Sequence, residues 1–224
     1  MKKVYNIEVF IYKVLRRKIR MTKKGKFIVF EGGEGAGKTL ATAMLKDYFA
    51  SKGIHVITTR EPGGCPAAEE TRTLIMNHEW SKQAEVYLFA AARLQHCHEK
   101  ITPALESGSM VISDRYTPSS YVYQGIVGEC GLDAVVEANK HAEPPDMVIY
   151  FDVDPEIGLK RIFSNSEREV TRFDKASLDV HHKWRAAYKS LADKGLYKDF
   201  RIVNANQTPE EVLEDLKAIV DELL

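Results

Sequence analysis

The stretch Gly32-Gly-Glu-Gly-Ala-Gly-Lys-Thr39 decides how this chain folds. It fills the pattern G-x-x-x-x-G-K-[ST], follows the apolar run Phe27-Ile-Val-Phe30, and precedes a helical pattern that begins near Leu40. The glycines let successive backbone N–H groups point inward, and the helix N-terminus adds partial positive charge, so the loop is expected to cradle the phosphates of a nucleotide. A glycine-rich turn without a ligand is the alternative, and it would have to produce the full match in this strand–loop–helix setting by chance.

Two side chains in this loop carry the chemistry that a phosphate cradle needs. Lys38 is expected to reach the β- and γ-phosphates, and the Thr39 hydroxyl is expected to ligate Mg²⁺. The sequence therefore predicts that a nucleoside triphosphate binds here together with a metal ion.

Apolar runs alternate with helical patterns along the rest of the chain. Strands are expected at residues 27–30, 56–58, 110–113, 147–151 and 201–203. Helices are expected at residues 40–51, 67–76, 81–107, 132–141, 155–164, 178–194 and 209–223, and Pro103 should bend or interrupt the longest one near its end. Such alternation is typical of a parallel sheet with both faces covered. We therefore predict an α/β fold of the P-loop NTPase type, a three-layer sandwich with a five-stranded parallel sheet flanked by helices and a short lid at about residues 164–172.

The bulk composition argues against several classes of function. The 224 residues suit one large α/β domain, and Lys plus Arg balance Asp plus Glu at 32 each. Without a net basic field, neither nucleic acid nor an anionic membrane is expected as a partner. Cys65, Cys97 and Cys130 lack the paired spacing of a zinc site or a thiol–disulfide motif, so we expect reduced thiols in the cytoplasm.

Residues 1–25 differ in character from the rest of the chain. Basic and apolar residues alternate there, but Asn6, Glu8 and Lys13 interrupt any signal-peptide core. Met21 stands shortly before the phosphate-binding loop, so we interpret residues 1–20 as an upstream extension or a disordered arm, with binding to a surface or partner as the alternative. Residues 26–224 are then expected to form a single domain.

Two polar clusters follow the early strands and would wall a pocket beside the nucleotide, because ligands collect at the carboxyl ends of parallel strands. Thr59-Arg-Glu-Pro-Gly-Gly64 predicts a tight, rigid loop, although an ordinary turn explains it equally well. Phe89 and Arg93 are four residues apart on one helix face and could hold a nucleobase. Taken alone, a core phenylalanine and a surface ion pair explain these two residues better.

Two later clusters indicate a phosphorylated acceptor. Asp114 and Arg115 close a strand, so Arg115 would bind the acceptor phosphate while Asp114 orients Arg115 or a Mg²⁺-bound water. A purely structural Asp–Arg pair is the alternative. In Ser119-Ser-Tyr-Val-Tyr-Gln-Gly125, Tyr123 offers a bulky ring and Gln124 an amide that can pair with a base edge.

Taken in order, these motifs resemble the thymidylate kinase family. FEGGEGAGKT is followed by TREPGG, by LFAAAR in a helix, by SDRY and by SSYVYQG, and the resemblance runs from about Lys26 to the C-terminus. It implies transfer of the γ-phosphate of ATP to dTMP, which gives dTDP and ADP in dTTP synthesis and requires Mg²⁺. It also implies a homodimer.

The resemblance assigns roles to individual residues. The residues expected to bind ATP are Gly32, Gly33, Glu34, Gly35, Ala36, Gly37, Lys38, Thr39 and Leu40. The residues expected to bind dTMP are Glu34, Pro62, Phe89, Arg93, Arg115, Ser120, Tyr123 and Gln124. Thr39 and, through water, Asp114 would hold the metal. The loop at residues 204–207 would lie beside adenine.

Within the acceptor site, Phe89 would stack on thymine, Arg93 and Gln124 would bond its edge, and Pro62 would lie beside the 5-methyl group. Tyr123 would crowd the 2′ carbon of the sugar and so disfavour a ribonucleotide.

The catalytic residues are expected to be Glu34, Lys38, Arg115, Arg168 and Arg172. Glu34 would contact the acceptor's 3′-hydroxyl or a metal-bound water. The two lid arginines, Arg172 above all, would supply charge because phosphoryl transfer needs cations around the transferring oxygens more than it needs an acid or base.

Four residues depart from the family's usual pattern. Ala92 stands where an aspartate commonly precedes the base-reading arginine, so we expect Arg93 to be less rigidly oriented. Leu40 and Cys65 replace common hydroxyl residues, and Thr171 replaces a common acid. We expect the reaction to survive these changes while affinity and selectivity shift.

Three other functions stay open on the sequence. The first is a kinase for another nucleoside monophosphate or for a deoxynucleoside, although Arg115 favours a phosphorylated acceptor. The second is a GTP-hydrolysing switch, which needs Asn-Lys-x-Asp where the chain has Asn139-Lys-His-Ala142 ahead of a strand. The third is an inactive binding subunit, which the intact Lys38, Thr39 and Asp114 disfavour.

Overall fold

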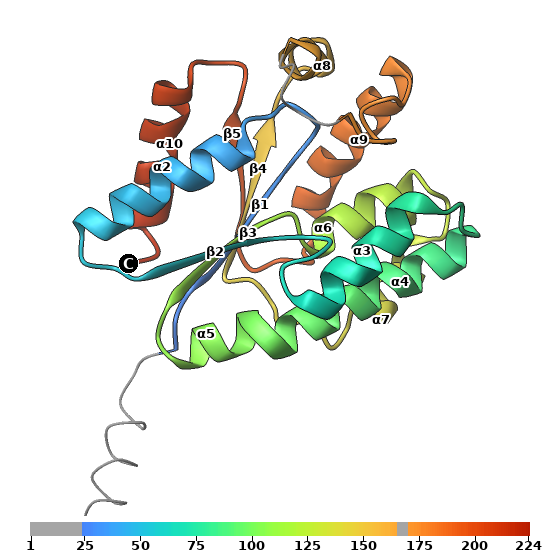
Figure 1. Cartoon of the computed structure of the whole chain (residues 1–224). Coiled ribbons are helices and arrows are strands. Elements are labelled where there is room, and N and C mark those ends of the chain that lie inside the picture. The colour runs from blue at the N-terminus through green and yellow to red at the C-terminus, as the bar shows by residue number, and fades with distance from the viewer. Residues whose placement is uncertain (1–23, 165–169) are drawn as a thin grey trace, which may run out of the picture.

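The computed structural model describes residues 24–164 and 170–224, which are arranged around one parallel sheet (Figure 1). Its strands are β1 (Phe27–Gly32), β2 (Val56–Arg60), β3 (Met110–Asp114), β4 (Met147–Asp152) and β5 (Phe200–Asn204). They lie in the order β2-β3-β1-β4-β5, and every neighbouring pair is parallel. The predicted α/β fold with a five-stranded parallel sheet is confirmed.

Helices cover both faces of the sheet (Figure 1). The α-helices are α2 (Lys38–Ser51), α3 (Pro66–Asn77), α4 (Lys82–His96), α5 (Thr102–Glu106), α6 (Thr117–Ser120), α7 (Leu132–Ala138), α8 (Pro155–Phe163), α9 (Leu178–Leu191) and α10 (Pro209–Asp221). Two π-helical segments are η1 (Cys97–Ile101) and η2 (Tyr121–Ile126), and η3 (Ala192–Lys194) is a 3-10 turn.

The core has two layers because side chains alternate along each buried strand. On one face Phe30 packs with Leu45 of α2 and Leu216 of α10. On the other face Val29 packs with Ile101 and Leu105, while the helices α4, α7 and α9 share a second cluster around β4. Every residue of β1 is buried, which explains why its first four residues, Phe27–Phe30, are all apolar.

The register of the central strands sets the position of the phosphate-binding loop. Phe30 of β1 lies opposite Asp114 of β3 and Ile149 of β4. The three strands therefore end side by side, and the residues that follow them meet at one edge of the sheet.

The long helix predicted at residues 81–107 is divided in the structure. α4 continues into the π-helical η1, where the N–H of Thr102 donates to the carbonyl of Cys97, and α5 then begins with Pro103 in its first turn. The predicted late interruption of the helix is present, and it falls at η1, just ahead of Pro103, which has no N–H to continue the regular hydrogen-bond ladder. The wider turn before it has no signature in the apolar pattern.

Two other helix predictions are wrong in part. The helix expected at residues 132–141 ends at Ala138, because the Asn139 amide turns back to donate to the carbonyl of Val135 at 2.8 Å. α6 and η2 were not predicted, although they carry Ser120, Tyr123 and Gln124. A four-residue helix that continues into a π-helical turn lacks the periodic length on which such predictions depend.

Some expectations lie outside the described residues. These are the N-terminal extension, except for its last two residues, and Arg168 within the expected lid. The single domain at residues 26–224 stays a prediction. Within residues 24–164 and 170–224, the helices lack the length and apolar character needed to cross a membrane.

Candidate active site

A cleft of about 570 Å³ opens at the carboxyl edge of the sheet, and most of the predicted site residues line it. The predicted residues on its walls are Glu34, Gly35, Ala36, Gly37, Lys38, Thr39, Leu40, Pro62, Phe89, Arg93, Asp114, Arg115, Ser120, Tyr123 and Gln124. Gly32 and Gly33 are not among the lining residues, and their carbonyl oxygens each accept a hydrogen bond of 3.1 Å from the Lys38 ammonium. The structure thus brings the phosphate-binding loop and the acceptor clusters into one cavity.

Lys38 lies buried at the base of the cleft. Burial lowers its pKa, as does the charge of Arg115, while the carboxylates of Asp114 and Glu34 oppose this change. Among the described residues the ammonium donates to two backbone carbonyls, so a bound phosphate would add a direct anionic partner.

The helix α8 packs directly on the loop because both surfaces carry glycine. A Cβ built on Gly158 would lie 2.3 Å from the carbonyl oxygen of Glu34, and one built on Gly35 would lie 2.1 Å from that of Gly158. Gly35 also has a φ of 71°, a left-handed conformation that glycine adopts without strain.

One turn along α8, Arg161 lines the cleft and links the loop to the end of β5. Its guanidinium donates to the carbonyl of Ala205 at 2.9 Å and to that of Gln207 at 3.4 Å. Arg161 therefore sits beside the 204–207 loop where adenine is expected. We did not predict it from the sequence, although its position three residues after Gly158 places it near the same face of α8.

The oxygens of Thr39 and Asp114 suit Mg²⁺. The Thr39 hydroxyl lies 3.1 Å from one carboxylate oxygen of Asp114, and the other oxygen, Oδ1, is buried and has no hydrogen-bond partner among the described residues. Mg²⁺ prefers such hard donors and completes its shell with water and phosphate. No cluster of three or more metal-ligating side chains occurs in the described part of the chain, so these two residues would need those further ligands.

Arg115 has its guanidinium fixed at the centre of the cleft. It forms an ion pair with Glu34 and donates at 3.3 Å to the hydroxyls of Ser119, Tyr123 and Tyr188. Burial acts to lower the pKa of Arg115, but Glu34 together with Tyr123, Tyr188 and Glu31 outweighs it, and the pKa is raised well above its ordinary value. The structure therefore holds a permanent cation opposite the loop.

The turn that carries Arg115 is strained and is held by Glu31. Arg115 has a φ of 69°, a conformation that costs a residue other than glycine about 1–3 kcal/mol. The Glu31 carboxylate, buried at the end of β1, accepts from the N–H groups of Tyr116 and Ser119 at 2.8 and 3.1 Å and from the hydroxyl of Tyr188 at 2.8 Å. Burial raises the pKa of Glu31.

Arg93 is almost fully buried, at 2% exposure, and its guanidinium is held by four acceptors. Nε donates to Glu61 at 2.6 Å, Nη1 donates to Ser120 at 3.1 Å and to Asn139 at 2.5 Å, and Nη2 donates to the carbonyl of Tyr116 at 3.0 Å. Arg93, for which base reading is predicted, is therefore held rigidly at the wall of the cleft.

This rigidity corrects one expectation. Ala92 was expected to leave Arg93 loosely oriented, but Glu61 from the loop after β2 supplies the missing carboxylate. Glu61 also accepts from Nδ1 of His96 at 3.0 Å, and Nε2 of His96 lies 2.7 Å from the Thr59 hydroxyl. These contacts through His96 hold the Glu61 carboxylate in place, and Glu61 in turn orients Arg93. Glu61 was missed because we interpreted its motif as a rigid loop that walls the pocket and assigned its carboxylate no role.

The ring of Tyr123 packs against other aromatic rings on both its face and its edge. It stacks on Trp184 with centroids 4.5 Å apart, Phe173 meets its edge at 5.4 Å, and its hydroxyl lies 3.4 Å from Glu34. Burial raises the pKa of Tyr123 well above its ordinary value, so the hydroxyl stays neutral. Phe89, at 9% exposure, lines the cleft one helical turn before Arg93.

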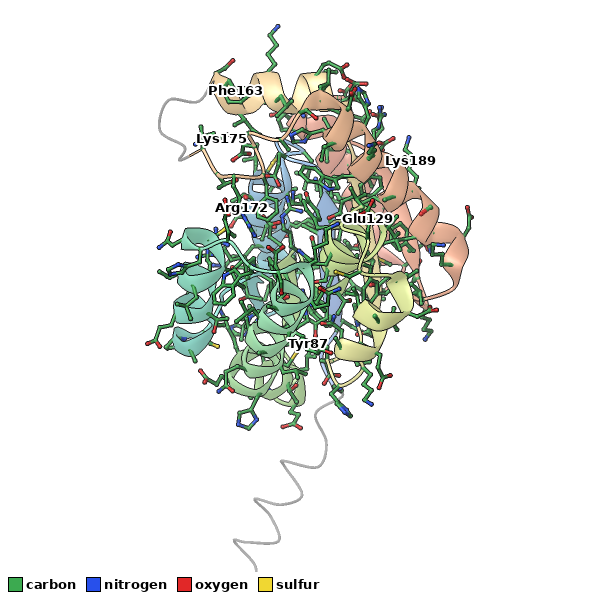
Figure 2. The ribbon with its side chains drawn as sticks, turned by 90° about the vertical axis from the view of Figure 1, so that its right-hand side faces the viewer. Tyr87, Glu129, Phe163, Arg172, Lys175 and Lys189 are labelled. Atoms are coloured by element: carbon green, nitrogen blue, oxygen red, sulfur yellow. The ribbon has the colours of Figure 1, made fainter. Side chains whose placement is uncertain are left out.

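Arg172 lies at the acceptor end of the cleft. Figure 2 shows it in the segment between α8 and α9, facing the α3–α4 pair. Its guanidinium donates to Glu85 of α4 at 2.8 Å, while its neighbours Thr171 and Phe173 line the cleft. The arginine thus lies beside α4, on the side of the cleft where the base is expected.

Comparisons with known proteins agree with this geometry. The family model described as thymidylate kinase matches residues 30–216. Among similar proteins, the thymidylate kinase of Geobacillus sp. (strain WCH70) is 40% identical over 208 residues, covering 89% of this chain and 98% of that protein. The thymidylate kinase of Ligilactobacillus salivarius (strain UCC118) is 39% identical over 208 residues, covering 90% of this chain and all of that protein.

A third relative, the thymidylate kinase of Geobacillus thermodenitrificans (strain NG80-2), is 42% identical over 202 residues, covering 88% of this chain and 89% of that protein. The matched region contains the loop, both arginines of the acceptor site and the described part of the segment between α8 and α9. With the whole cleft inside the match, the chain belongs to the thymidylate kinase family.

Proposed function

We propose that this chain transfers the γ-phosphate of ATP to dTMP and releases dTDP and ADP. The observation that carries the proposal is the single cleft that joins the phosphate-binding loop to a base pocket, with the buried cation Arg115 between them. A triphosphate on Lys38 and a monophosphate on Arg115 would meet there.

The chain's own residues would act mainly by position and charge. Lys38 holds the transferring phosphoryl group, and Arg115 holds the acceptor phosphate against it, so repulsion between two anions is offset at the point of transfer. Thr39 and Asp114 would hold Mg²⁺, which would neutralise negative charge on the phosphates. Glu34 keeps Arg115 oriented while it contacts the sugar or a metal-bound water.

The base pocket supports thymine as the acceptor base. A guanidinium has five N–H groups, and Arg93 directs four to Glu61, Ser120, Asn139 and Tyr116, which leaves one on Nη2 for the O4 of thymine. Phe89 would stack on the ring. The immobile Tyr123 would occupy the space that a 2′-hydroxyl needs.

Several parts of the proposal rest on the family, on the composition of the sequence and, for the metal, on the oxygens of Thr39 and Asp114. These are the need for Mg²⁺, assembly as a homodimer, a cytoplasmic location, and partners limited to ATP and dTMP without nucleic acid or membrane. Arg172 remains our candidate for added charge on the transferring group, a role that would require it to leave Glu85.

The test is ADP formation from Mg·ATP with dTMP, dUMP, thymidine, dGMP, dCMP and AMP offered separately. We expect the highest kcat/KM with dTMP and no turnover when EDTA removes the metal. Preference for thymidine or a purine monophosphate would replace the proposal with another nucleotide kinase.

Lys38→Ala tests the phosphate-binding loop in the same assay. It should abolish nearly all turnover, because the buried cation on the transferring phosphates is lost. Lys46→Ala, at an exposed position of the same helix, is the matched control and should keep the parent's turnover. Normal turnover in Lys38→Ala would refute the role of the loop.

A further inference from the structure

One buried face of α4 continues beyond the two predicted base-binding residues. Glu85, Phe89 and Arg93 follow one another at intervals of four residues and so share a face of the helix. The Glu85 side chain is only 17% exposed, although glutamate is rarely buried without a purpose for its charge.

Both oxygens of Glu85 are engaged by residues of the proposed site. One accepts from Nε2 of Gln124 at 2.8 Å, and the other accepts from Nη2 of Arg172 at 2.8 Å. Arg172 in turn lies over the ring of Phe173, 4.8 Å from its centroid. The carboxylate is therefore held from two sides and cannot easily turn away from Gln124.

The contact with Gln124 matters because an amide can read a base in two opposite ways. With its oxygen toward the base it accepts from a donor such as N3–H of thymine or uracil. Turned by 180° it donates to an acceptor such as N3 of cytosine. A glutamine that nothing orients can adopt either state and discriminates poorly.

Glu85 removes this ambiguity. An ionised carboxylate only accepts hydrogen bonds, so the amide nitrogen of Gln124 must face it, and the flipped state would place two oxygens against each other. Gln124 lines the cleft whereas Glu85 does not. The amide nitrogen of Gln124 therefore faces Glu85, outside the cleft lining, and the amide oxygen is the atom that can contact the substrate.

We infer that Glu85 is a specificity-determining positioning residue, whose carboxylate fixes the Gln124 amide so that the site accepts thymine and uracil and rejects cytosine. The inference rests on the proposed acceptor site and adds to it a residue that does not touch the substrate.

The test compares kcat/KM for dTMP, dUMP and dCMP in the parent and in Glu85→Gln, with Mg·ATP fixed. The neutral amide at 85 can pair with either orientation of Gln124, so the dTMP/dCMP ratio should fall roughly tenfold or more. The dTMP/dUMP ratio should stay within about twofold, since both bases present the same edge. Because each ratio comes from one preparation, a partly unfolded variant does not affect it.

Three further variants separate the explanations. Glu70→Gln removes an exposed carboxylate of α3 and should leave both ratios unchanged. Arg172→Gln should lower turnover with dTMP and dCMP alike. A fall in its dTMP/dCMP ratio equal to that of Glu85→Gln would overturn the inference, because Glu85 would then act through Arg172 alone.

Gln124→Ala distinguishes failure of the inference from failure of the proposed site. If Gln124→Ala lowers the dTMP/dCMP ratio and Glu85→Gln does not, Gln124 reads the base and the role of Glu85 is refuted. If neither variant changes the ratio, the proposed base contact of Gln124 is refuted and the inference falls with it.

Discussion

At the scale of single residues, the site depends on buried charges that compensate one another. Arg93 and Glu61 are exposed by only 2% and 4% at their side chains, with Nε and Oε2 2.6 Å apart. Removing both charges from water is costly, and the ion pair with its further hydrogen bonds offsets that cost only while both partners are present. The pair therefore stabilises the orientation of Arg93 more than it stabilises the fold.

Glu61→Ala should destabilise the protein by about 3–5 kcal/mol, because it leaves the Arg93 guanidinium buried without its counter-ion. Urea unfolding at neutral pH measures the change. Glu214→Ala, which breaks the exposed pair with Lys217, is the control and should leave the free energy of unfolding almost unchanged. If both variants lose equally little free energy of unfolding, the buried Arg93 guanidinium does not need Glu61 as its counter-ion.

The residues missed from the sequence share one property, which is that their partners lie far away along the chain. Arg93 and Glu61 are 32 positions apart, and the Glu31 carboxylate bonds to a backbone N–H 85 positions later. Motif spacing could predict Lys38 and Arg115 because the chemistry belongs to those residues themselves. It could not predict which carboxylate would orient them, since that depends on how separate loops meet.

At the scale of elements, β4 and α9 are joined by an ionic cluster near the cleft. Asp152 at the end of β4 accepts from Arg185 at 2.6 Å and from Lys189 at 2.7 Å, both on α9. Burial acts to raise the pKa of Asp152, but these two cations outweigh it and lower the pKa below its ordinary value of 3.8. The cluster ties the helix that carries Trp184 and Tyr188 to the sheet.

The sign of the pH dependence follows from this lowered pKa. A carboxylate that ionises more readily in the folded state stabilises the protein above its unfolded pKa, and that stabilisation is lost as the pH falls through the folded pKa. The free energy of unfolding of the parent should therefore exceed that of Asp152→Asn by about 1–2 kcal/mol at pH 7. Below pH 3.8 the difference should shrink toward zero.

Urea unfolding of both proteins between pH 2.5 and 7, roughly the range that acid linkage covers, checks this expectation. Asp193→Asn, an exposed carboxylate just after α9, controls for the loss of a negative charge. A difference between the parent and Asp152→Asn that stays constant across this range would show that the cluster is not linked to ionisation of Asp152.

The strands were easier to predict from the sequence than the π-helical segments. All five strands were located, and only their ends extended further, as in β1 to Gly32. The central strands β1, β3 and β4 are buried almost throughout and are therefore nearly continuous apolar runs, whereas the edge strands β2 and β5 are only partly buried. The break between α4 and α5 and the short α6–η2 segment depend on π-helical turns. Such turns are fixed by tertiary contacts, such as the Cys97 thiol 2.9 Å from the Tyr116 hydroxyl, and not by periodicity.

At the scale of the whole molecule, the contacts that hold β1 in place begin earlier in the chain than the residues that line the cleft. The first residue that lines the cleft is Glu34, and the family match begins at residue 30. Just before β1, Lys24 pairs with Glu143, the N–H of Gly25 donates to the carbonyl of Leu105 at 2.8 Å, and Lys26 pairs with an aspartate at 2.8 Å. Shortening the chain from its N-terminus should therefore remove stabilising contacts before it removes any residue of the cleft.

A chain that begins at Met21 should keep the parent's Tm and its kcat/KM with dTMP, because it retains these anchors and the whole cleft. A chain that begins with a methionine placed directly before Phe27 should lose about 2 kcal/mol of stability, since three contacts to the sheet edge are removed. Thermal unfolding and the ADP assay on the two truncated chains test both limits. If the Met21 chain loses turnover or stability, residues 1–20 contribute to the enzyme and our interpretation of them as an extension is wrong.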